Sequence, residues 1–154
     1  MVANAMISEA LEKRDMGRIT TEITVENLKD LWDAREERIA ASAVRSAVIP
    51  NALVDTGATF LSLPTSLIRQ LGLKKSSSRR IMTSKGPAES DVYDTVRLTI
   101  QGRSCNQDVM EVPDGVPVLV GQLPLEALDF VVDPVQQKVI GNPEHGGEQM
   151  YDLL

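Results

Sequence analysis

Aromatic residues are scarce in this chain, and cysteine occurs only once. Aromatic side chains make up 3% of the 154 residues, so a packed core has to come from Val, Leu and Ile, which concentrate after residue 47. Because Cys105 is the single cysteine, no disulfide can form within the chain, which is typical of proteins from a reducing compartment. We therefore expect a cytoplasmic protein with an aliphatic core.

Long apolar segments are missing as well. No segment approaches the roughly 18 apolar residues of a membrane-spanning helix. Charged residues between Met1 and Arg18 interrupt any apolar segment of the signal-peptide kind, so we expect neither export nor membrane contact. The net charge of −6 disfavours nucleic acid as a partner. Arg79 and Arg80, the one pair of adjacent arginines, are predicted to lie in a solvated loop.

The sequence divides into three predicted parts. Residues 1–16 are predicted to be an N-terminal tail, 17–44 an extension made of a strand and a helix, and 45–154 the main domain. Residues 19–25 are rich in β-branched side chains and predict a strand. A helix is predicted over 28–40, with Asn27 as its N-cap.

After Val48, short apolar segments alternate with turn residues, a texture that predicts a small all-β barrel or sandwich with short helices. The polar segment 76–90, with Lys85-Gly86-Pro87 near its middle, predicts a turn between two extended arms. The remaining expected elements are strands at 52–54, 92–100, 106–112 and 116–120, helical segments at 64–71 and 124–128, and a closing hairpin over 130–140.

Asp55-Thr56-Gly57 directly follows the apolar strand Ala52-Leu53-Val54. An aspartate at the end of a buried strand needs a partner for its charge, and Gly57 allows a close approach of another backbone. Two interpretations stay open on these residues alone: a catalytic carboxylate at a protein surface, or an Asx turn that ends a strand.

Leu53–Thr59 (LVDTGAT) resembles the active-site loop of the retroviral-like aspartic peptidases, the retropepsins and their bacterial relatives. The family also has an apolar segment ending in Gly near its C-terminal end, followed by a short helix. Val118-Leu119-Val120-Gly121 and the residues after it are similar to that motif. Between the two motifs the family has a glycine-tipped flap, for which residues 82–92 are the candidate. The order matches over residues 45–142 and is most similar to bacterial stand-alone members.

The resemblance implies a retropepsin-like acid-protease barrel with one lobe per chain. It implies an aspartic endopeptidase with Asp55 as the catalytic residue, supported by Thr56, Gly57 and Ala58. Since the chemistry needs two carboxylates that share a proton and only one Asp-Thr-Gly is present, it further implies a homodimer that joins two copies of Asp55. The implied partner is a peptide or protein substrate, and neither a cofactor nor a metal is expected. Lys85, Gly86 and Pro87 would form the flap tip; an ordinary hairpin loop is the alternative.

The sequence departs from the viral pattern at two places. Viral enzymes usually have Arg directly after the second-motif glycine, where this chain has Gln122, and they often have Asp where this chain has Thr59-Phe60. In the viral enzymes those two residues form an ion pair at the dimer interface. The viral way of bracing the dimer is therefore not expected here.

Two other functions remain open at this point. One is a non-catalytic dimeric module that binds peptides, or assembles with partners, through the same groove. The other is a latent enzyme whose first 44 residues cover the groove. His145 has no paired His or Cys, which makes a metal site unexpected. Cys105 has no general base among its sequence neighbours, so it is not expected to act as a nucleophile.

Overall fold

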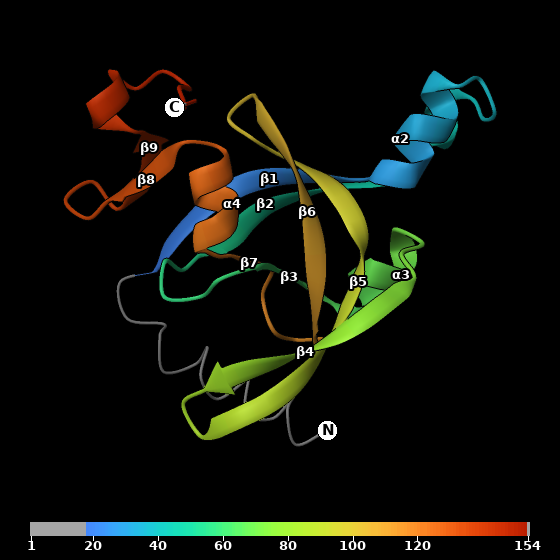
Figure 1. Cartoon of the computed structure of the whole chain (residues 1–154), viewed down its shortest axis with the longest axis horizontal. Coiled ribbons are helices and arrows are strands. Elements are labelled where there is room, and N and C mark those ends of the chain that lie inside the picture. Colours follow the sequence, from blue (N-terminus) through green and yellow to red (C-terminus); the bar gives the residue numbers. More distant parts are fainter. Residues whose placement is uncertain (1–17, 154) are drawn as a thin grey trace.

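Strand β5 (Gly86–Ile100) organises the fold, because it pairs with three other strands. A computed structural model describes residues 18–153 of the chain (Figure 1). Along one edge β5 pairs with β6 (Arg103–Val112). Along its other edge the first half pairs with β4 (Lys75–Thr83) and the second half with β1 (Ile19–Asn27).

The pairing of β1 with β5 closes a barrel. The strand order is β1-β2-β7-β3-β6-β5, with β4 added beyond β5, and the β1–β5 ladder joins the two ends of the six-stranded part. The all-β prediction is thereby confirmed. The other barrel strands are β2 (Ser46–Val54), β3 (Leu61–Pro64) and β7 (Leu119–Val120).

Short helices and a small hairpin surround the barrel. Figure 1 shows α2 at one end of the molecule, with the β8–β9 hairpin and the C-terminus at the other end. None of the described helices is long and apolar enough to cross a membrane. These elements are α2 (Leu28–Arg35), α3 (Thr65–Gln70), α4 (Gln122–Ala127), β8 (Phe130–Asp133), β9 (Lys138–Gly141) and the 3₁₀ turns Ala41–Ala43 and Pro143–His145.

The core is aliphatic, as the composition predicts. Buried Val, Leu and Ile side chains from β1, β2, β3, β5, β6 and β7 meet inside the barrel. Phe130 joins them and the partly buried Tyr93 packs against them, whereas Trp32 on α2 is 48% exposed. Removing this apolar surface from water is the main stabilising contribution to the fold.

Most predicted elements are present, with informative differences at their ends. Asn27 caps α2 as predicted, its side chain accepting a hydrogen bond from the backbone N–H of Asp30 at 3.0 Å. The helix ends at Arg35 rather than near residue 40, because Glu37 has a φ of 60°. The strand predicted at 116–120 is shorter, Leu119–Val120, and Pro117 just before it has no N–H for a ladder.

The loop predicted for Arg79 and Arg80 is wrong. Both arginines lie inside β4, opposite Ser90 and Glu89 of β5. Every residue from Lys75 to Arg80 is exposed, so the strand lacks the alternation of apolar and polar side chains that identifies a half-buried strand in a sequence.

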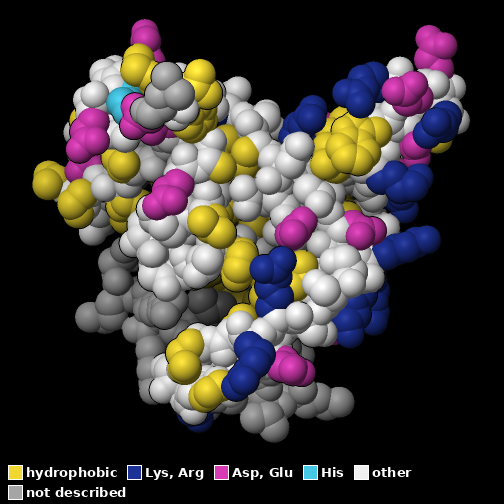
Figure 2. Space-filling view, in the orientation of Figure 1, with side chains coloured by type: hydrophobic (Ala, Val, Ile, Leu, Met, Phe, Trp, Pro, Cys, Tyr) yellow, Lys and Arg dark blue, Asp and Glu magenta, His cyan; other side chains and the backbone are white. Residues whose placement is uncertain are grey.

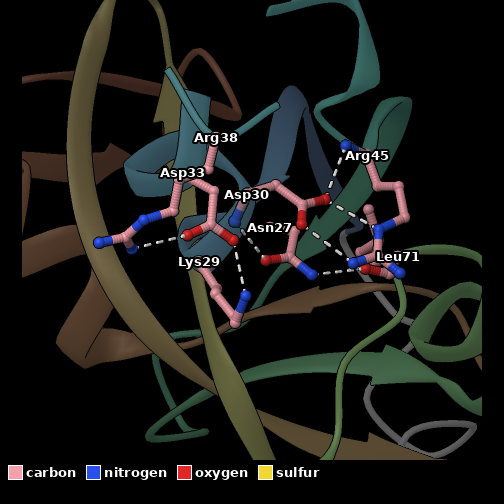
Figure 3. A network of polar contacts seen from close by, with 7 residues as sticks. All are labelled: Asn27, Lys29, Asp30, Asp33, Arg38, Arg45 and Leu71. Atoms are coloured by element: carbon pink, nitrogen blue, oxygen red, sulfur yellow. Dashed lines mark hydrogen bonds and ion pairs between the residues drawn. The ribbon is translucent and has the colours of Figure 1, made fainter. Parts of the chain in front are cut away.

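A polar network ties the predicted extension to the main domain (Figure 3). The buried Asp30 carboxylate accepts hydrogen bonds from Arg45 Nε, Nη2 and backbone N–H at 2.8, 2.9 and 3.0 Å. Asn27 Nδ2 donates to the Leu71 carbonyl at 2.8 Å. The hydrogen bonds from Arg45 are the main reason that the pKa of Asp30 lies below its usual value.

Gly72 leaves space for that network. A Cβ at this position would lie 1.8 Å from Arg45 Nη1, and the φ of +66° is one that glycine adopts without strain. The division of the chain at residue 45 remains a prediction, although β1 pairs with strands on the far side of that boundary. The predicted tail, residues 1–16, lies outside the described residues.

Candidate active site

Asp55 lies immediately after the last residue of β2, in a tight turn. Its side-chain Oδ1 accepts a hydrogen bond from the Gly57 N–H at 2.8 Å, and its carbonyl accepts from the Ala58 N–H at 3.1 Å. Asp55 itself is half-buried, whereas Thr56 and Gly57 are exposed. The Asx-turn geometry that the sequence left open is therefore present. It holds the half-buried carboxylate at the surface, where a catalytic role stays a prediction.

The second predicted motif lies directly beside this turn. Strand β7 runs parallel to β2, pairing Val54 with Val120, and antiparallel to β3, pairing Leu61 with Val120. The Asp55 N–H donates to the Val120 carbonyl at 3.0 Å. The resemblance pairs the Asp55 motif with the motif that ends at Gly121. In the structure the two motifs are neighbours, because β2 and β7 are adjacent strands.

Helix α4 begins on the loop that follows Gly57. The N–H groups of Gly121, Gln122 and Leu123 donate to the carbonyls of Phe60, Ala58 and Thr59 at 3.0, 2.8 and 2.9 Å, respectively. A helix start leaves its first N–H groups without partners inside the helix, so these bonds join the helix to the loop. The loop geometry is fixed from both sides, by β7 and by α4.

Gly121 has no room for a side chain. A Cβ there would lie 2.6 Å from the Thr59 carbonyl carbon and 2.7 Å from the Phe60 oxygen. Its φ of −89° is available to any residue. The glycine of the second motif is therefore required by the close approach of the active-site loop, not by its own backbone conformation.

A groove of about 380 Å³ lies between this loop and the β4–β5 hairpin. Its walls combine apolar side chains with a few hydroxyls, a mixture typical of ligand sites. None of the described residues before 45 lines it. The lining residues are Gly57, Ala58, Thr59, Phe60, Ser62, Arg80, Ile81, Met82, Thr83, Ser90, Met110, Val112 and Leu119.

The candidate flap is the β4–β5 hairpin, which turns at Ser84 and Lys85. Thr83 Oγ1 donates to the Gly86 carbonyl at 2.9 Å and accepts from the Lys85 N–H at 3.2 Å. Gly86 has a φ of +113°, which explains glycine at this end of the turn. Thus Lys85, Gly86 and Pro87 do lie at or beside the tip, and the residues just before the turn line the groove.

Several groove residues could not be identified from the sequence. Phe60 follows the active-site loop, and Met110 and Val112 come from β6, which reaches the site only through its pairing with β3 and β5. Their apolar character in the sequence indicates a core strand equally well. Which side of β6 faces a groove depends on non-local pairing.

The His145 side chain has a structural partner. Its Nδ1 lies 2.6 Å from Asp129 Oδ2, and this contact raises the pKa of His145 and lowers that of Asp129. Burial raises the pKa of the Cys105 thiol, which disfavours the reactive thiolate. Within residues 18–153, no group of three or more His, Cys, Asp and Glu side chains is arranged to hold a metal ion.

Comparison with known proteins identifies the family of the chain. A family model described as aspartyl protease matches residues 45–139, and the chain therefore belongs to the aspartyl protease family, as the sequence predicts. Among solved structures, EIAV protease complexed with the inhibitor HBY-793 is similar at 20% identity and a TM-score of 0.49, covering 72% of this chain and 88% of that chain. No curated protein sequence matches the chain significantly.

Proposed function

We propose that this protein is an aspartic endopeptidase that works as a homodimer, with one Asp55 from each protomer forming the catalytic pair. The family assignment supports peptidase chemistry in general. The observation that carries the specific proposal is the Asp55 turn: a surface carboxylate held between β2, β7 and the start of α4, beside a groove lined by the β4–β5 hairpin. Only one such turn is available per chain, since Asp-Thr-Gly occurs once.

The proposed reaction uses the two carboxylates and one water molecule. Like charges about 3 Å apart cannot both ionise, so the pair shares one proton. The charged Asp55 takes a proton from water as the water oxygen attacks the scissile carbonyl carbon. The protonated Asp55 of the other protomer gives its proton to the carbonyl oxygen, and the tetrahedral intermediate collapses as a proton reaches the leaving nitrogen.

The exposure of the loop fits a two-fold contact. Thr56 and Gly57 are exposed in the single chain, and in a two-fold dimer the same patch on each protomer faces its copy. We assign Thr56 to hydrogen bonding across the dimer, and Gly57 to the close approach of substrate or water. Ala58 supports the loop through its carbonyl, which accepts from the Gln122 N–H.

The substrate is proposed to bind as an extended peptide. Strand β4 pairs on one side with β5, and among the described strands no other pairs with its outer edge. A peptide in the groove would add to such an edge by backbone hydrogen bonds, while pockets accept its alternate side chains. Lys85, Gly86 and Pro87 would close over it as the flap tip.

The decisive test is a peptide-library digest with the wild-type protein and Asp55→Asn. The wild type should cleave, and the variant should lose cleavage by at least about a thousandfold, as is usual for the loss of a group essential to proton transfer. Asparagine preserves the Oδ1 acceptor that binds the Gly57 N–H, so circular dichroism and sedimentation should stay unchanged. A wild type that binds peptides but cleaves none would favour the non-catalytic peptide-binding module instead.

A further inference from the structure

Arg79 is one of the two adjacent arginines of β4, and the strand register decides which way each points. Directly paired residues of antiparallel strands place their side chains on the same face. Arg79 pairs with Ser90, and Arg80 pairs with Glu89. Ser90 is buried and lines the groove, so the register places the Arg79 side chain on the groove face with Ser90 and the Arg80 side chain on the outer face with Glu89. Arg80 is nevertheless one of the residues that line the groove, and the contact that sets Arg79 apart is the one with Phe60.

Two further contacts agree with this alternation. On the outer face Ser78 Oγ bonds Asp91 Oδ1 at 3.1 Å. On the groove face the Arg79 guanidinium lies 5.7 Å from the centre of the Phe60 ring, and Phe60 lines the groove. Stacking of a guanidinium over an aromatic ring leaves its N–H groups in the plane free to bind a planar anion. Arg79 is exposed, so it stands at the rim of the groove.

Acidic side chains are absent from the lining of the groove beside Arg79, as far as the structure describes it: none of the described lining residues is Asp or Glu. Glu111 lies between Met110 and Val112, which line the groove, and therefore points to the opposite face of β6. There it accepts from Thr65 Oγ1 at 2.9 Å. The nearest acids along β5, Glu89 and Asp91, lie on the outer face with Arg80 and Ser78.

The hairpin as a whole has the opposite charge to the rest of the chain. Residues 75–91 contain four Lys or Arg and two Asp or Glu, whereas the chain carries a net charge of −6. Figure 2 shows Lys and Arg side chains along the β4–β5 hairpin. A positively charged hairpin on a protein with a negative net charge attracts acidic groups specifically to that hairpin.

We infer that Arg79 selects substrates that carry an Asp or Glu side chain, binding this carboxylate over Phe60 at the rim of the groove. The inference rests on the proposed function, since it names the substrate class of the same groove. The guanidinium fork fits a carboxylate with two parallel N–H···O bonds. The remaining lining, with Ile81, Met110 and Leu119, would take apolar neighbours of that acidic residue.

The test uses acetylated and amidated peptides, so that any acid preference comes from a side chain and not from a free C-terminus. Peptides from the library digest are remade with Glu, Gln or Lys at each position in turn. With the wild type, one position should favour Glu over Gln by roughly five- to tenfold in kcat/KM. That preference should shrink between low and high salt, because the arginine is exposed.

Four variants decide which residue carries the preference. Arg79→Gln should abolish it, and Arg79→Glu should replace it with a preference for Lys at the same position. Arg80→Gln should weaken it less than Arg79→Gln does, because Arg80 lines the groove but its side chain shares the outer face with Glu89. Arg97→Gln makes the same change of net charge on β5, opposite Asn106 of β6, and serves as the control for an overall charge effect.

Failure of this inference is distinguishable from failure of the proposed function. If the wild type cleaves peptides but no position favours an acid, or if Arg80→Gln rather than Arg79→Gln removes the preference, the role of Arg79 is overturned while the peptidase stands. If no peptide is cleaved, the same library is bound to immobilised Asp55→Asn protein. Acidic peptides retained by that protein, and lost with an added Arg79→Gln change, would support the inference without catalysis; retention independent of charge would overturn it.

Discussion

The backbone N–H of Asp55 donates to the carbonyl of Val120 at 3.0 Å, joining two motifs that lie 65 positions apart in the chain. This bond continues the parallel pairing of β2 with β7 by one residue beyond Val54. The candidate catalytic residue Asp55 therefore lies next to the motif that ends at Gly121. The turn that presents the carboxylate is thus anchored to the barrel, which is what a preorganised catalytic group needs.

Replacing Gly121 with alanine should destabilise the protein and disturb the active-site loop together. The new Cβ would lie 2.6–2.8 Å from backbone atoms of Thr59 and Phe60, and a backbone cannot move aside as a flexible side chain can. We expect a loss of about 1–3 kcal/mol in the free energy of unfolding, measured by urea denaturation, and a fall in peptide cleavage.

Gly102→Ala is the control for that experiment. Gly102 has a φ of +80° and open space around its missing Cβ, so the substitution costs backbone strain of about 1 kcal/mol without a clash. It should leave cleavage unchanged. Equal effects of both substitutions on cleavage would contradict the proposed contact between Gly121 and the loop.

Activity should depend on protein concentration, because the proposed site requires two copies of Asp55. Dilution below the dissociation constant of the dimer should lower the rate per protomer, in parallel with a change from dimer to monomer in sedimentation velocity. A mixture of wild type with excess Asp55→Asn protein should lose activity faster than simple dilution explains, since mixed dimers have one carboxylate. A monomer with full activity would rule out the shared site.

Asp30→Ala should destabilise the fold by about 2–4 kcal/mol at pH 7, because it leaves the Arg45 hydrogen bonds without their buried acceptor. The pKa of Asp30 in the folded protein lies below its usual 3.8, chiefly through its hydrogen bonds with Arg45. Its contribution is therefore complete above that usual value, and it is lost as the pH falls below 3.8 and through the folded pKa. Urea denaturation at pH 7, 5 and 3 measures this difference.

Lys29→Ala provides the comparison. Lys29 pairs with Asp33 at 2.6 Å, but its side chain is 77% exposed, and exposed pairs contribute little. Its effect should be small at every pH. If Asp30→Ala lowered the free energy of unfolding at pH 7 as little as Lys29→Ala does, the hydrogen bonds between Asp30 and Arg45 would not be a significant link between α2 and the start of β2.

The His145–Asp129 contact should hold the C-terminal segment in a pH-dependent way. Asp129 Oδ2 lies 2.6 Å from His145 Nδ1 and accepts from the Met150 N–H at 3.1 Å, and Asn142 Nδ2 donates to Asp129 Oδ1 at 3.2 Å. The Asp129 hydrogen bond raises the pKa of His145 above 6.5, and the charges of Asp152 and Glu144 raise it further. The contribution of the charged pair is thus complete below pH 6.5 and is lost as the pH rises through the folded pKa.

NMR titration of the His145 ring and amide exchange of residues 142–150 measure both parts of this prediction. Asp129→Asn should lower the pKa of His145 towards its usual value and make the protection factors of the amides in that segment independent of pH in this range. Glu144→Gln, which removes a weaker charge contribution, should lower it less. An unshifted His145 in the wild type would contradict the contact.

Features that depend on a short stretch of sequence were predictable, whereas features that depend on the pairing of distant strands were not. Asp55 and Gly121 were identifiable because they lie in motifs that resemble those of a known family, and the Gly86 turn was identifiable from Lys85-Gly86-Pro87. In the structure, Gly121 is required by close approach and Gly86 has a positive φ. The direction of Arg79 was not predictable, because β4 is exposed on both faces and its polar sequence resembles a loop. The closure of the barrel was equally unpredictable, since the sequence of residues 19–27 does not indicate that this strand pairs with β5.

That closure leads to a prediction about the N-terminal part of the chain. The family match begins at residue 45, yet β1 lies between β2 and β5 and buries Ile23 and Val25 in the core. A chain that begins at residue 28 would open the barrel between β2 and β5 and expose both edges. It should fail to fold, whereas a chain that begins at Met16 should keep its circular dichroism spectrum, its stability and its proposed dimer.

Point substitutions in β1 make the same argument without a truncation. Val25→Asp places a charge inside the barrel and should cost more than about 4 kcal/mol, enough to unfold many small domains. Thr20→Asp makes a similar change of charge at an exposed position of the same strand and should be nearly neutral. If the shortened chain folded and cleaved peptides, or if both substitutions were equally mild, residues 17–44 would be a dispensable extension, and the barrel would have to close in another way.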